Sequence, residues 1–116
     1  MNQDKPLKII NIRIREKTLM EIKKRCDQKT ITAYIRDLLY EGMQYAEKED
    51  MYIYLNEHNN SYKTEGKKYF TIRVSENTYN KIRELSNSSG VSLPRISGHF
   101  IERGLEREMK KEWSFL

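Results

Sequence analysis

Two short segments of the sequence carry a hydrogen-bonding side chain at every second residue. Asn11 and Arg13 alternate with isoleucines in the first, and Thr71 and Arg73 alternate with apolar residues in the second. Such alternation predicts β-strands with one polar and one apolar face. Arginine can donate two hydrogen bonds to guanine, asparagine can bridge two atoms of adenine, and threonine can contact a thymine methyl. The chemistry of these side chains thus fits recognition of base edges, and a sheet face that only contacts solvent gives the same pattern.

Residue types that perform catalysis or bind metals are present without the partners that they need. The single cysteine, Cys26, cannot form an internal disulfide, and neither it nor the histidines His58 and His99 has metal-ligand spacing. We expect Cys26 to be a small buried helix residue and the histidines to lie at the surface or in helix packing. Because the sequence has no nucleophile–base pair, glycine-rich phosphate loop or paired carboxylates, it predicts no enzyme activity, metal or cofactor.

The charged residues form three blocks along the 116-residue chain, whose net charge is +5. Residues 1–36 carry ten basic and four acidic side chains, residues 37–66 carry two and seven, and residues 67–116 carry ten and six. Ordinary solvated surface explains such blocks, but so do two phosphate-contacting units joined by an acidic connector. The sequence has no apolar run typical of a membrane span or signal peptide, and its single cysteine favours the cytoplasm.

Both basic blocks contain a copy of one sequence pattern. Five residues of the first copy recur unchanged 60 positions later, and Gly42 matches Gly104 at a spacing of 62. The two extra residues of the second copy fall within 86–90, a run of turn-forming residues in which added length costs little. Chance similarity between amphipathic helices is the alternative, but it does not explain the shared order of strand, helix, turn and helix. The five pairs are Ile12 and Ile72, Arg13 and Arg73, Glu16 and Glu76, Thr18 and Thr78, and Ile22 and Ile82.

After each strand, apolar residues recur at helical spacing, and capping residues mark the ends of the helices. Ser75 is a good N-cap for the first helix of the second copy, whereas Arg15 is a poor one at the same position of the first copy. Gly90 favours a helix stop, and Thr30 and Ser92 favour the start of each second helix. The buried faces are predicted to comprise Leu19, Ile22, Cys26, Ile31, Tyr34, Ile35, Leu38, Leu39 and Met43, and Tyr79, Ile82, Leu85, Leu93, Ile96, Phe100, Ile101 and Leu105.

A strand followed by two helices leaves both edges of the strand unpaired, so we do not expect one copy to fold alone. Two copies solve this problem by pairing their strands over a shared four-helix core. We therefore predict a mainly α-helical fold with a two-stranded antiparallel ribbon, built from β-α-α repeated twice. Across the pseudo-twofold axis between the copies, Asn11 is expected to face Thr71, and Ile9 to face Tyr69, so the two DNA half-sites should differ. Pairing within one chain and pairing between chains, in a homo-oligomer or an array on DNA, both fit the sequence.

This arrangement of polar-faced strands and helix pairs resembles the ribbon-helix-helix (MetJ/Arc-type) family of DNA-binding regulators. The resemblance covers residues 7–43 and 67–105, and the tandem form is similar to TraY-type conjugation proteins and certain archaeal virus regulators. In that family the paired strands enter the major groove of double-stranded DNA, and their outward residues contact base edges. The resemblance gives this role to Ile9, Asn11, Arg13, Tyr69, Thr71 and Arg73.

The resemblance also implies phosphate contacts where the second helix of each copy begins. Free backbone N–H groups and the helix dipole favour an anion there. Basic residues beside these helix ends and beside the strands would add salt-dependent contacts. The expected phosphate-contacting residues are Lys8, Lys29, Thr30, Ile31, Lys67, Lys68, Ser92, Leu93 and Arg95.

The connector and the C-terminal segment show less of the periodicity that predicts secondary structure. Residues 44–66 are too long for a turn and, at 51–55, too apolar for a free linker, so we expect them to extend the preceding helix and then pack. Residues 106–116 are expected to form a helical extension, with Leu105, Met109 and Trp113 on one face. That face either folds over the core of its own chain or contacts another chain.

The sequence thus favours a sequence-specific DNA-binding transcriptional regulator, with repression as its expected action. The expected location is the cytoplasm, in association with the nucleoid, or the host cytoplasm for a viral protein. One alternative is an accessory DNA-binding protein of plasmid conjugation or partition. Another is a protein-binding adaptor or antitoxin without a primary role at DNA. A helix-turn-helix would need its recognition helix within 31–43, where the apolar residues have the spacing of core residues.

Overall fold

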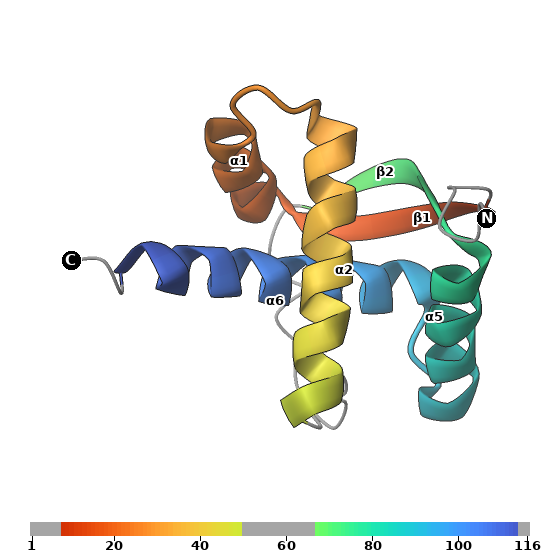
Figure 1. Cartoon of the computed structure of the whole chain (residues 1–116). Coiled ribbons are helices and arrows are strands. Elements are labelled where there is room, and N and C mark those ends of the chain that lie inside the picture. The colour runs from red at the N-terminus through yellow and green to blue at the C-terminus, as the bar shows by residue number, and fades with distance from the viewer. Residues whose placement is uncertain (1–7, 50–66, 114–116) are drawn as a thin grey trace, which may run out of the picture.

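The computed structural model of the chain describes residues 8–49 and 67–113, which form two strands and four helices (Figure 1). The elements follow in the order strand, helix, helix, strand, helix, helix. The predicted mainly helical fold with a two-stranded antiparallel sheet is confirmed for these residues. The elements are β1 (Lys8–Arg15), α1 (Glu16–Arg25), α2 (Ile31–Glu49), β2 (Lys67–Val74), α5 (Glu76–Ser89) and α6 (Leu93–Trp113).

The two strands pair antiparallel along their whole length and form a ribbon. Asn11 lies opposite Thr71 at its centre, as predicted. The expectation that Ile9 faces Tyr69 was wrong, because Ile9 pairs with Arg73. In an antiparallel pair, residues that precede the centre on one strand lie opposite residues that follow it on the other. Ile9 and Tyr69 both precede the centre by two positions, so they lie at opposite ends of the ribbon.

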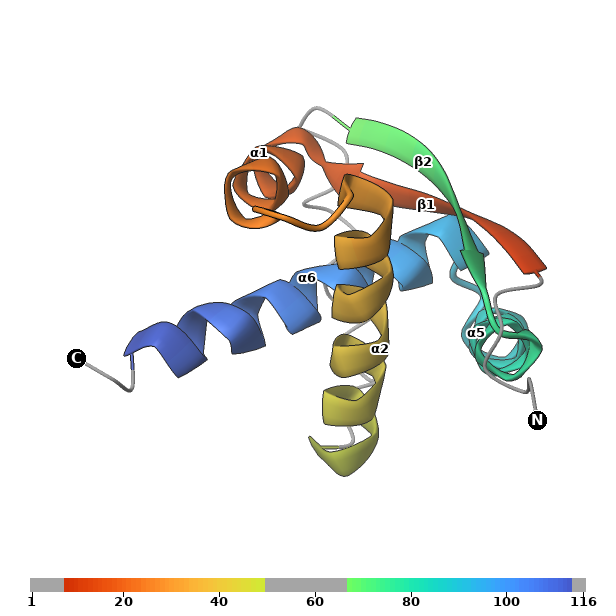
Figure 2. The ribbon, with the colours of Figure 1, turned by 45° about the horizontal axis from the view of Figure 1, so that its top comes forward.

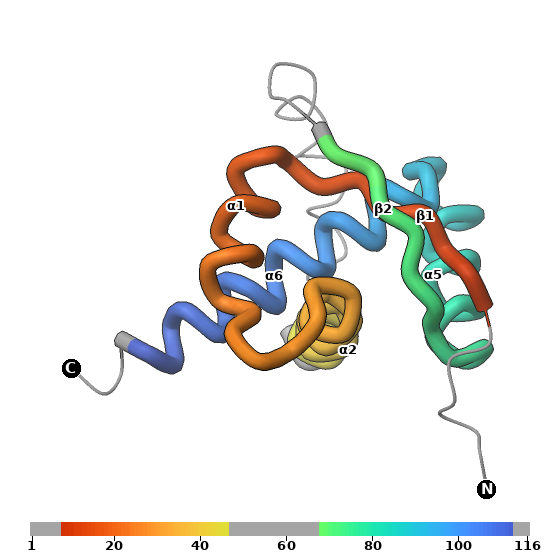
Figure 3. The backbone as a smooth tube through the Cα atoms, turned by 90° about the horizontal axis from the view of Figure 1, so that it is seen from above, coloured from red at the N-terminus to blue at the C-terminus, as the bar shows by residue number. Residues whose placement is uncertain are grey.

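The apolar face of the ribbon supplies one wall of the core. Ile10, Ile12 and Ile14 of β1 and Ile72 and Val74 of β2 are at most 2% exposed, so the predicted alternation is confirmed. Seen from above, α6 runs beneath the ribbon, while α1 and α5 lie on opposite sides of it (Figure 3). The helices complete the core with Leu19, Ile22, Tyr34, Ile35, Leu38, Leu39, Met43, Ala46, Ile82, Val91, Ile96, Phe100, Ile101 and Leu105.

The helix ends follow the predicted capping residues. Ser75 Oγ accepts a hydrogen bond from the backbone N–H of Thr78 at 3.2 Å, whereas Arg15 makes no side-chain cap at the start of α1. Thr30 Oγ1 accepts from the backbone N–H three residues later, at 3.1 Å, and so caps α2. Gly90 ends α5 with a φ of 77°, in the left-handed region that glycine adopts without strain.

The long helices α2 and α6 cross in close contact at two glycines (Figure 2). A Cβ atom on Gly42 would lie 1.8 Å from the carbonyl oxygen of Phe100, and one on Gly104 would lie 2.1 Å from the carbonyl oxygen of Leu38. The contacts are reciprocal, since Leu38 and Phe100 each precede the glycine of their own helix by four residues. Only glycine permits this approach of two helix backbones.

Several predicted core residues are only partly buried. Cys26 is the C-cap of α1 and is partly exposed, so the prediction of a buried helix residue was wrong. The helix ends one residue earlier, and Cys26 therefore lies at the rim of the core. Ile31 and Leu93 are the first residues of their helices, where less of the side chain is covered. Tyr79 and Leu85 pack against the core from α5.

The remaining predictions on the connector, the tail and the histidines are tested in part. α2 continues to Glu49, which confirms that the connector extends this helix, and α6 continues to Trp113. His99 packs within α6 at 6% exposure. His58, residues 50–66 and residues 114–116 lie outside the described residues. None of the described helices combines the length and apolar character needed to cross a bilayer.

Candidate nucleic-acid interface

The outward face of the ribbon brings together all six residues predicted to contact bases. They occupy alternate positions of β1 and β2, between the buried residues that anchor the strands to the core. The large side chains of Ile9 and Tyr69 are 57% and 64% exposed. The face consists of the exposed residues Ile9, Asn11, Tyr69, Thr71 and Arg73 together with the partly exposed Arg13.

The register gives the two ends of this face similar chemistry. Arg73 lies opposite Ile9 at one end, and Arg13 lies opposite Tyr69 at the other. Each end therefore combines a guanidinium group with an apolar or aromatic side chain. A guanidinium group can donate two parallel hydrogen bonds to the acceptors on the major-groove edge of guanine, and a neighbouring apolar side chain can contact a methyl group.

The centre of the face has a different composition from its ends. Thr71 Oγ1 donates a hydrogen bond to Asn11 Oδ1 across the ribbon at 3.1 Å. Both residues are exposed, so the pair lies on the solvent side of the strands. The asparagine Oδ1 takes part in this bond, which leaves its amide N–H groups as donors for an external partner.

The first turns of α2 and α6 lie nearer the ribbon than the last turns do (Figures 1 and 2). Thr30 and Ser92, which precede these helices, are both exposed. The side chains of Ile31 and Leu93 are partly covered, so these residues would contact a phosphate through their backbone N–H groups. The structure thus places both predicted anion-binding helix ends beside the ribbon, where the helix dipoles favour negative charge.

The predicted lysine contacts differ in their surroundings. Lys29 Nζ lies 2.6 Å from Asp37 Oδ2, and this hydrogen bond raises the pKa of Lys29 above its usual value. Lys68 Nζ lies 4.0 Å from Glu16 Oε1 at the surface. Both lysines are exposed, and such pairs exchange readily with other partners.

The other basic residues beside the ribbon have further contacts. Lys8 is exposed, with its Nζ 5.8 Å from the centre of the Tyr79 ring. Arg95, in the first turn of α6, is partly buried and has a partner within the structure. Lys67 begins β2, but its side chain is outside what the structure describes.

Arg36 is a residue of this surface that sequence reasoning missed. Its Nε donates a hydrogen bond to the carbonyl oxygen of Arg73 at 2.7 Å, so α2 is joined to the outer edge of β2. This contact fixes a guanidinium group beside the strand that carries the predicted base contacts. The repeat aligns Arg36 with Gly98, because each lies six residues before the matching glycine, Gly42 or Gly104. This alignment was the signal in the sequence that could have indicated Arg36.

Gly98 occupies the corresponding place between α6 and β1. A Cβ atom there would lie 1.9 Å from the carbonyl oxygen of Arg13. The helix α6 therefore packs directly on the edge of β1, whereas the side chain of Arg36 spans the distance between α2 and β2. The two flanks of the ribbon are built with different spacing, and only the β2 flank carries an arginine at this position.

The two strands also differ in the side-chain contacts at the point where each strand meets its following helix, which we call the joint. Near β1, the Glu102 carboxylate accepts hydrogen bonds from Arg15 at 3.0 Å and from the Thr18 hydroxyl at 2.9 Å. Near β2, the Tyr40 hydroxyl accepts a hydrogen bond of 3.4 Å from the backbone N–H of Ser75. These groups occupy matching places in the two copies of the sequence pattern.

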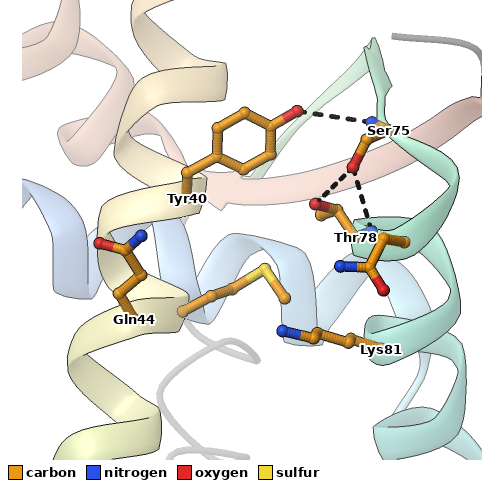
Figure 4. Close-up of a pocket in the computed structure, with 7 residues that line it drawn as sticks. Tyr40, Gln44, Ser75, Thr78 and Lys81 are labelled. Carbon is orange, nitrogen blue, oxygen red and sulfur yellow. Dashed lines mark hydrogen bonds between the residues drawn. The ribbon is translucent and has the colours of Figure 1, made fainter. Parts of the chain in front are cut away.

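A cavity of ≈ 430 Å³ opens beside the Tyr40–Ser75 contact, between α2 and α5 (Figure 4). The side chains around it carry hydroxyl, amide, ammonium and thioether groups. The cavity lies behind the end of β2 and not on the outward face of the ribbon, so it is separate from the predicted base contacts. Its lining residues are Tyr40, Met43, Gln44, Ser75, Asn77, Thr78 and Lys81.

The C-terminal half of α6 is joined by charged side chains to the first copy of the pattern. Lys111 Nζ lies 3.0 Å from Glu41 and 3.1 Å from Glu108, and these two hydrogen bonds raise the pKa of Lys111. Burial raises the pKa of the Glu41 carboxyl. Arg25 at the end of α1 forms an ion pair with Glu112. These contacts favour the interpretation that this part of the tail folds over its own chain.

Within residues 8–49 and 67–113, no three histidine, cysteine or acidic residues gather closely enough to hold a metal ion. The exposed groups of the ribbon face are hydrogen-bond donors, acceptors and apolar side chains. Such a face can recognise a surface that presents both charge and a hydrogen-bonding pattern.

Comparison of the chain with family models, with curated protein sequences and with solved structures found no match.

Proposed function

We propose that this protein is a sequence-specific regulator that binds double-stranded DNA by inserting its β-ribbon into the major groove, and that it acts as a repressor. One observation carries the proposal: six alternate residues of two strands form one outward face, with Arg13 and Arg73 on either side of its centre. A two-stranded ribbon fits the width of the major groove, and arginine is the side chain most often used to recognise guanine there. A protein seated in the groove at a promoter excludes other proteins from that site.

We further propose that the chain is a tandem ribbon-helix-helix, with both motifs supplied by one polypeptide. The order of the elements supports this proposal, as does the antiparallel pairing of β1 with β2 in the same chain. The reciprocal contacts of Gly42 and Gly104 add support, because they relate the two long helices in the way that a twofold axis would. The ribbon follows the same relation, since its central pair consists of matching residues of the two copies.

Phosphate contacts on both sides of the ribbon complete the proposed interface. The first turns of α2 and α6 offer backbone N–H groups, and Lys29 and Lys68 offer exposed ammonium groups. Arg36 adds a guanidinium group on the β2 flank. Such contacts fix the position of the protein on the duplex, while the ribbon face provides the sequence preference.

Selection of duplexes from a random-sequence library, followed by gel-shift titration of the selected duplex, tests the function. Arg13→Ala and Arg73→Ala should each weaken binding by about 1–3 kcal/mol and relax the preference at one base position. Lys68→Ala should weaken binding to all duplexes alike and should lower the salt dependence by about one released ion. Lys110→Ala is the matched control, because it removes an exposed charge from the far end of α6.

Two results would overturn the proposal. Unchanged sequence preference in both arginine variants would exclude the ribbon face from base recognition. Absence of any salt-dependent binding to duplex DNA would exclude the DNA-binding function and would favour the adaptor alternative.

A further inference from the structure

The twofold relation of the ribbon face is broken most clearly at its centre. Arg13 and Arg73 occupy matching places on the two strands, so the outer positions present the same hydrogen-bonding group in both orientations of the protein. The central pair also consists of matching residues, but one is asparagine and the other threonine. Rotation of the protein by half a turn on a duplex therefore exchanges an amide with a hydroxyl at the central bases.

The hydrogen bond within the central pair sharpens this difference. Because the Thr71 hydroxyl donates to Asn11 Oδ1, the amide of Asn11 presents N–H donors to the groove. Thr71 presents its methyl group and the two lone pairs of its hydroxyl oxygen. The favoured base edge under Asn11 is thus rich in acceptors, as in guanine, while the favoured group near Thr71 is a thymine methyl or a base amino group.

The other asymmetric positions distinguish the two orientations less well. Ile9 and Tyr69 also occupy matching places beside an arginine, where both present apolar surface and Tyr69 adds a hydroxyl at the tip of its ring. Apolar contacts discriminate weakly between similar partners, whereas a hydrogen-bonding group that loses its partner on binding discriminates strongly. At the centre both matching residues carry a hydrogen-bonding group and the two groups differ, whereas the outer pair differs by the single Tyr69 hydroxyl. We therefore assign the larger part of the difference between the two orientations to the central pair.

We infer that the protein binds its DNA site in a single orientation, which the Asn11–Thr71 pair determines. This inference rests on the proposed function and deepens it, because it assigns a polarity to the complex. The DNA site would then contain two similar outer half-sites around an asymmetric centre. A protein bound with fixed polarity presents α1 and the first turn of α2 to one defined side of the site, and α5 to the other (Figure 3).

The only cysteine of the chain allows the orientation to be measured directly. Cys26 lies at the end of α1, on one side of the ribbon, and is partly exposed. An iron–EDTA chelate attached to this thiol cleaves DNA close to α1. The probe is the best duplex selected from the random library, with a detectable label at one end or the other. Wild-type protein that carries the chelate is compared with the exchange variant N11T/T71N that carries it, and with I9Y/Y69I as the matched control.

We expect wild-type protein to cleave one side of the duplex about tenfold more than the other. This ratio is typical of one hydrogen-bonded contact that distinguishes between two bases. N11T/T71N should cleave the opposite side, and I9Y/Y69I should keep the wild-type side. Both exchanges involve exposed side chains, so the thermal unfolding of the variants should match that of the wild type.

The possible failures are distinguishable. Equal cleavage on both sides by the wild type, with binding still sequence-specific, overturns the inference and leaves the proposed function intact. Reversal by I9Y/Y69I but not by N11T/T71N overturns the assignment to the central pair. Absence of a selected duplex refutes the proposed function, and the inference fails with it.

Discussion

The two halves of the described chain, residues 8–49 and 67–113, share an order of elements but differ in how strand and helix are joined. In the second half, Gly98 lets α6 pack directly on β1 of the first half. In the first half, Arg36 takes the matching place and reaches β2 with its side chain. The comparison shows that the same order of elements allows a helix to pack directly on the strand on one side of the ribbon, and to reach the strand through a side chain on the other. Close packing and polar bridging are alternative ways to fix the same strand.

A second difference concerns the contacts between each strand and the helix that follows it. In the joint at β1, the Glu102 carboxylate accepts hydrogen bonds from Arg15 and Thr18. The joint at β2 has Tyr40 near Ser75 and retains a cavity of ≈ 430 Å³. Three hydrogen bonds to one carboxylate hold the joint at β1, whereas the Tyr40 phenol accepts one hydrogen bond at the joint at β2. The two joints should therefore contribute unequally to stability, and variants at matching places can measure the difference.

The largest effect is expected at the helix crossing, where the halves are alike. Gly42→Ala and Gly104→Ala each place a methyl group against a backbone carbonyl oxygen, which cannot move aside as a flexible side chain would. Each should lower the free energy of unfolding by about 3 kcal/mol or more. Urea unfolding followed by circular dichroism measures the loss, and Gln44→Ala, at an exposed position of α2, is the control. Well-folded alanine variants of wild-type stability would contradict the close crossing.

The next effect separates the flanks of the ribbon. Gly98→Ala should destabilise the protein by about 2 kcal/mol or more, because its methyl group would overlap the carbonyl oxygen of Arg13. Arg36→Ala removes one hydrogen bond at the surface and should cost about 1 kcal/mol or less. The same urea titrations compare the two variants. Equal losses would show that the flanks are joined in the same way.

A smaller difference is expected between the two joints. Glu102→Ala leaves Arg15 and Thr18 without their carboxylate partner and should cost about 2 kcal/mol. Tyr40→Phe removes only the hydroxyl that accepts from the Ser75 N–H, at a cost of about 1 kcal/mol or less. Thermal unfolding at matched pH and salt resolves the two variants. A larger loss for Tyr40→Phe would reverse the comparison.

The smallest effect concerns the starts of the long helices. Thr30→Ala removes the side-chain cap of α2 and should cost about 1 kcal/mol. For Ser92, at the matching place before α6, the described residues show a hydrogen bond only at its backbone carbonyl, so Ser92→Ala should cost about 0.5 kcal/mol or less. Denaturant titration of both variants gives the difference. Equal costs would indicate that the Ser92 hydroxyl also caps its helix.

The sequence predicted those parts of the fold that depend on local pattern. The alternation of residues 10–15 and 70–75 predicted the strands and their buried faces, and Ser75 and Gly90 marked the ends of α5. The repeat also matched Gly42 with Gly104, the two glycines at which the long helices cross. These features follow from periodicity and capping, which act within a few residues.

Features that depend on the distance between elements were not predicted. Cys26 has helical spacing, but its burial depended on where α1 ends. The bridge from Arg36 and the cavity beside Tyr40 depend on how far α2 lies from β2. The pairing of Ile9 with Arg73 required the register and not only the alternation. Spacing between elements is set by the summed packing of many side chains, which a single segment does not encode.

The pairing of β1 with β2 inside one polypeptide has a consequence for how the ribbon forms on dilution. Closure of the ribbon is a first-order process, because the second strand is always tethered to the first. Its equilibrium is governed by an effective concentration that the chain itself fixes. The folded population and the melting temperature should therefore be the same at nanomolar and micromolar protein, whereas a ribbon assembled from two chains dissociates as it is diluted.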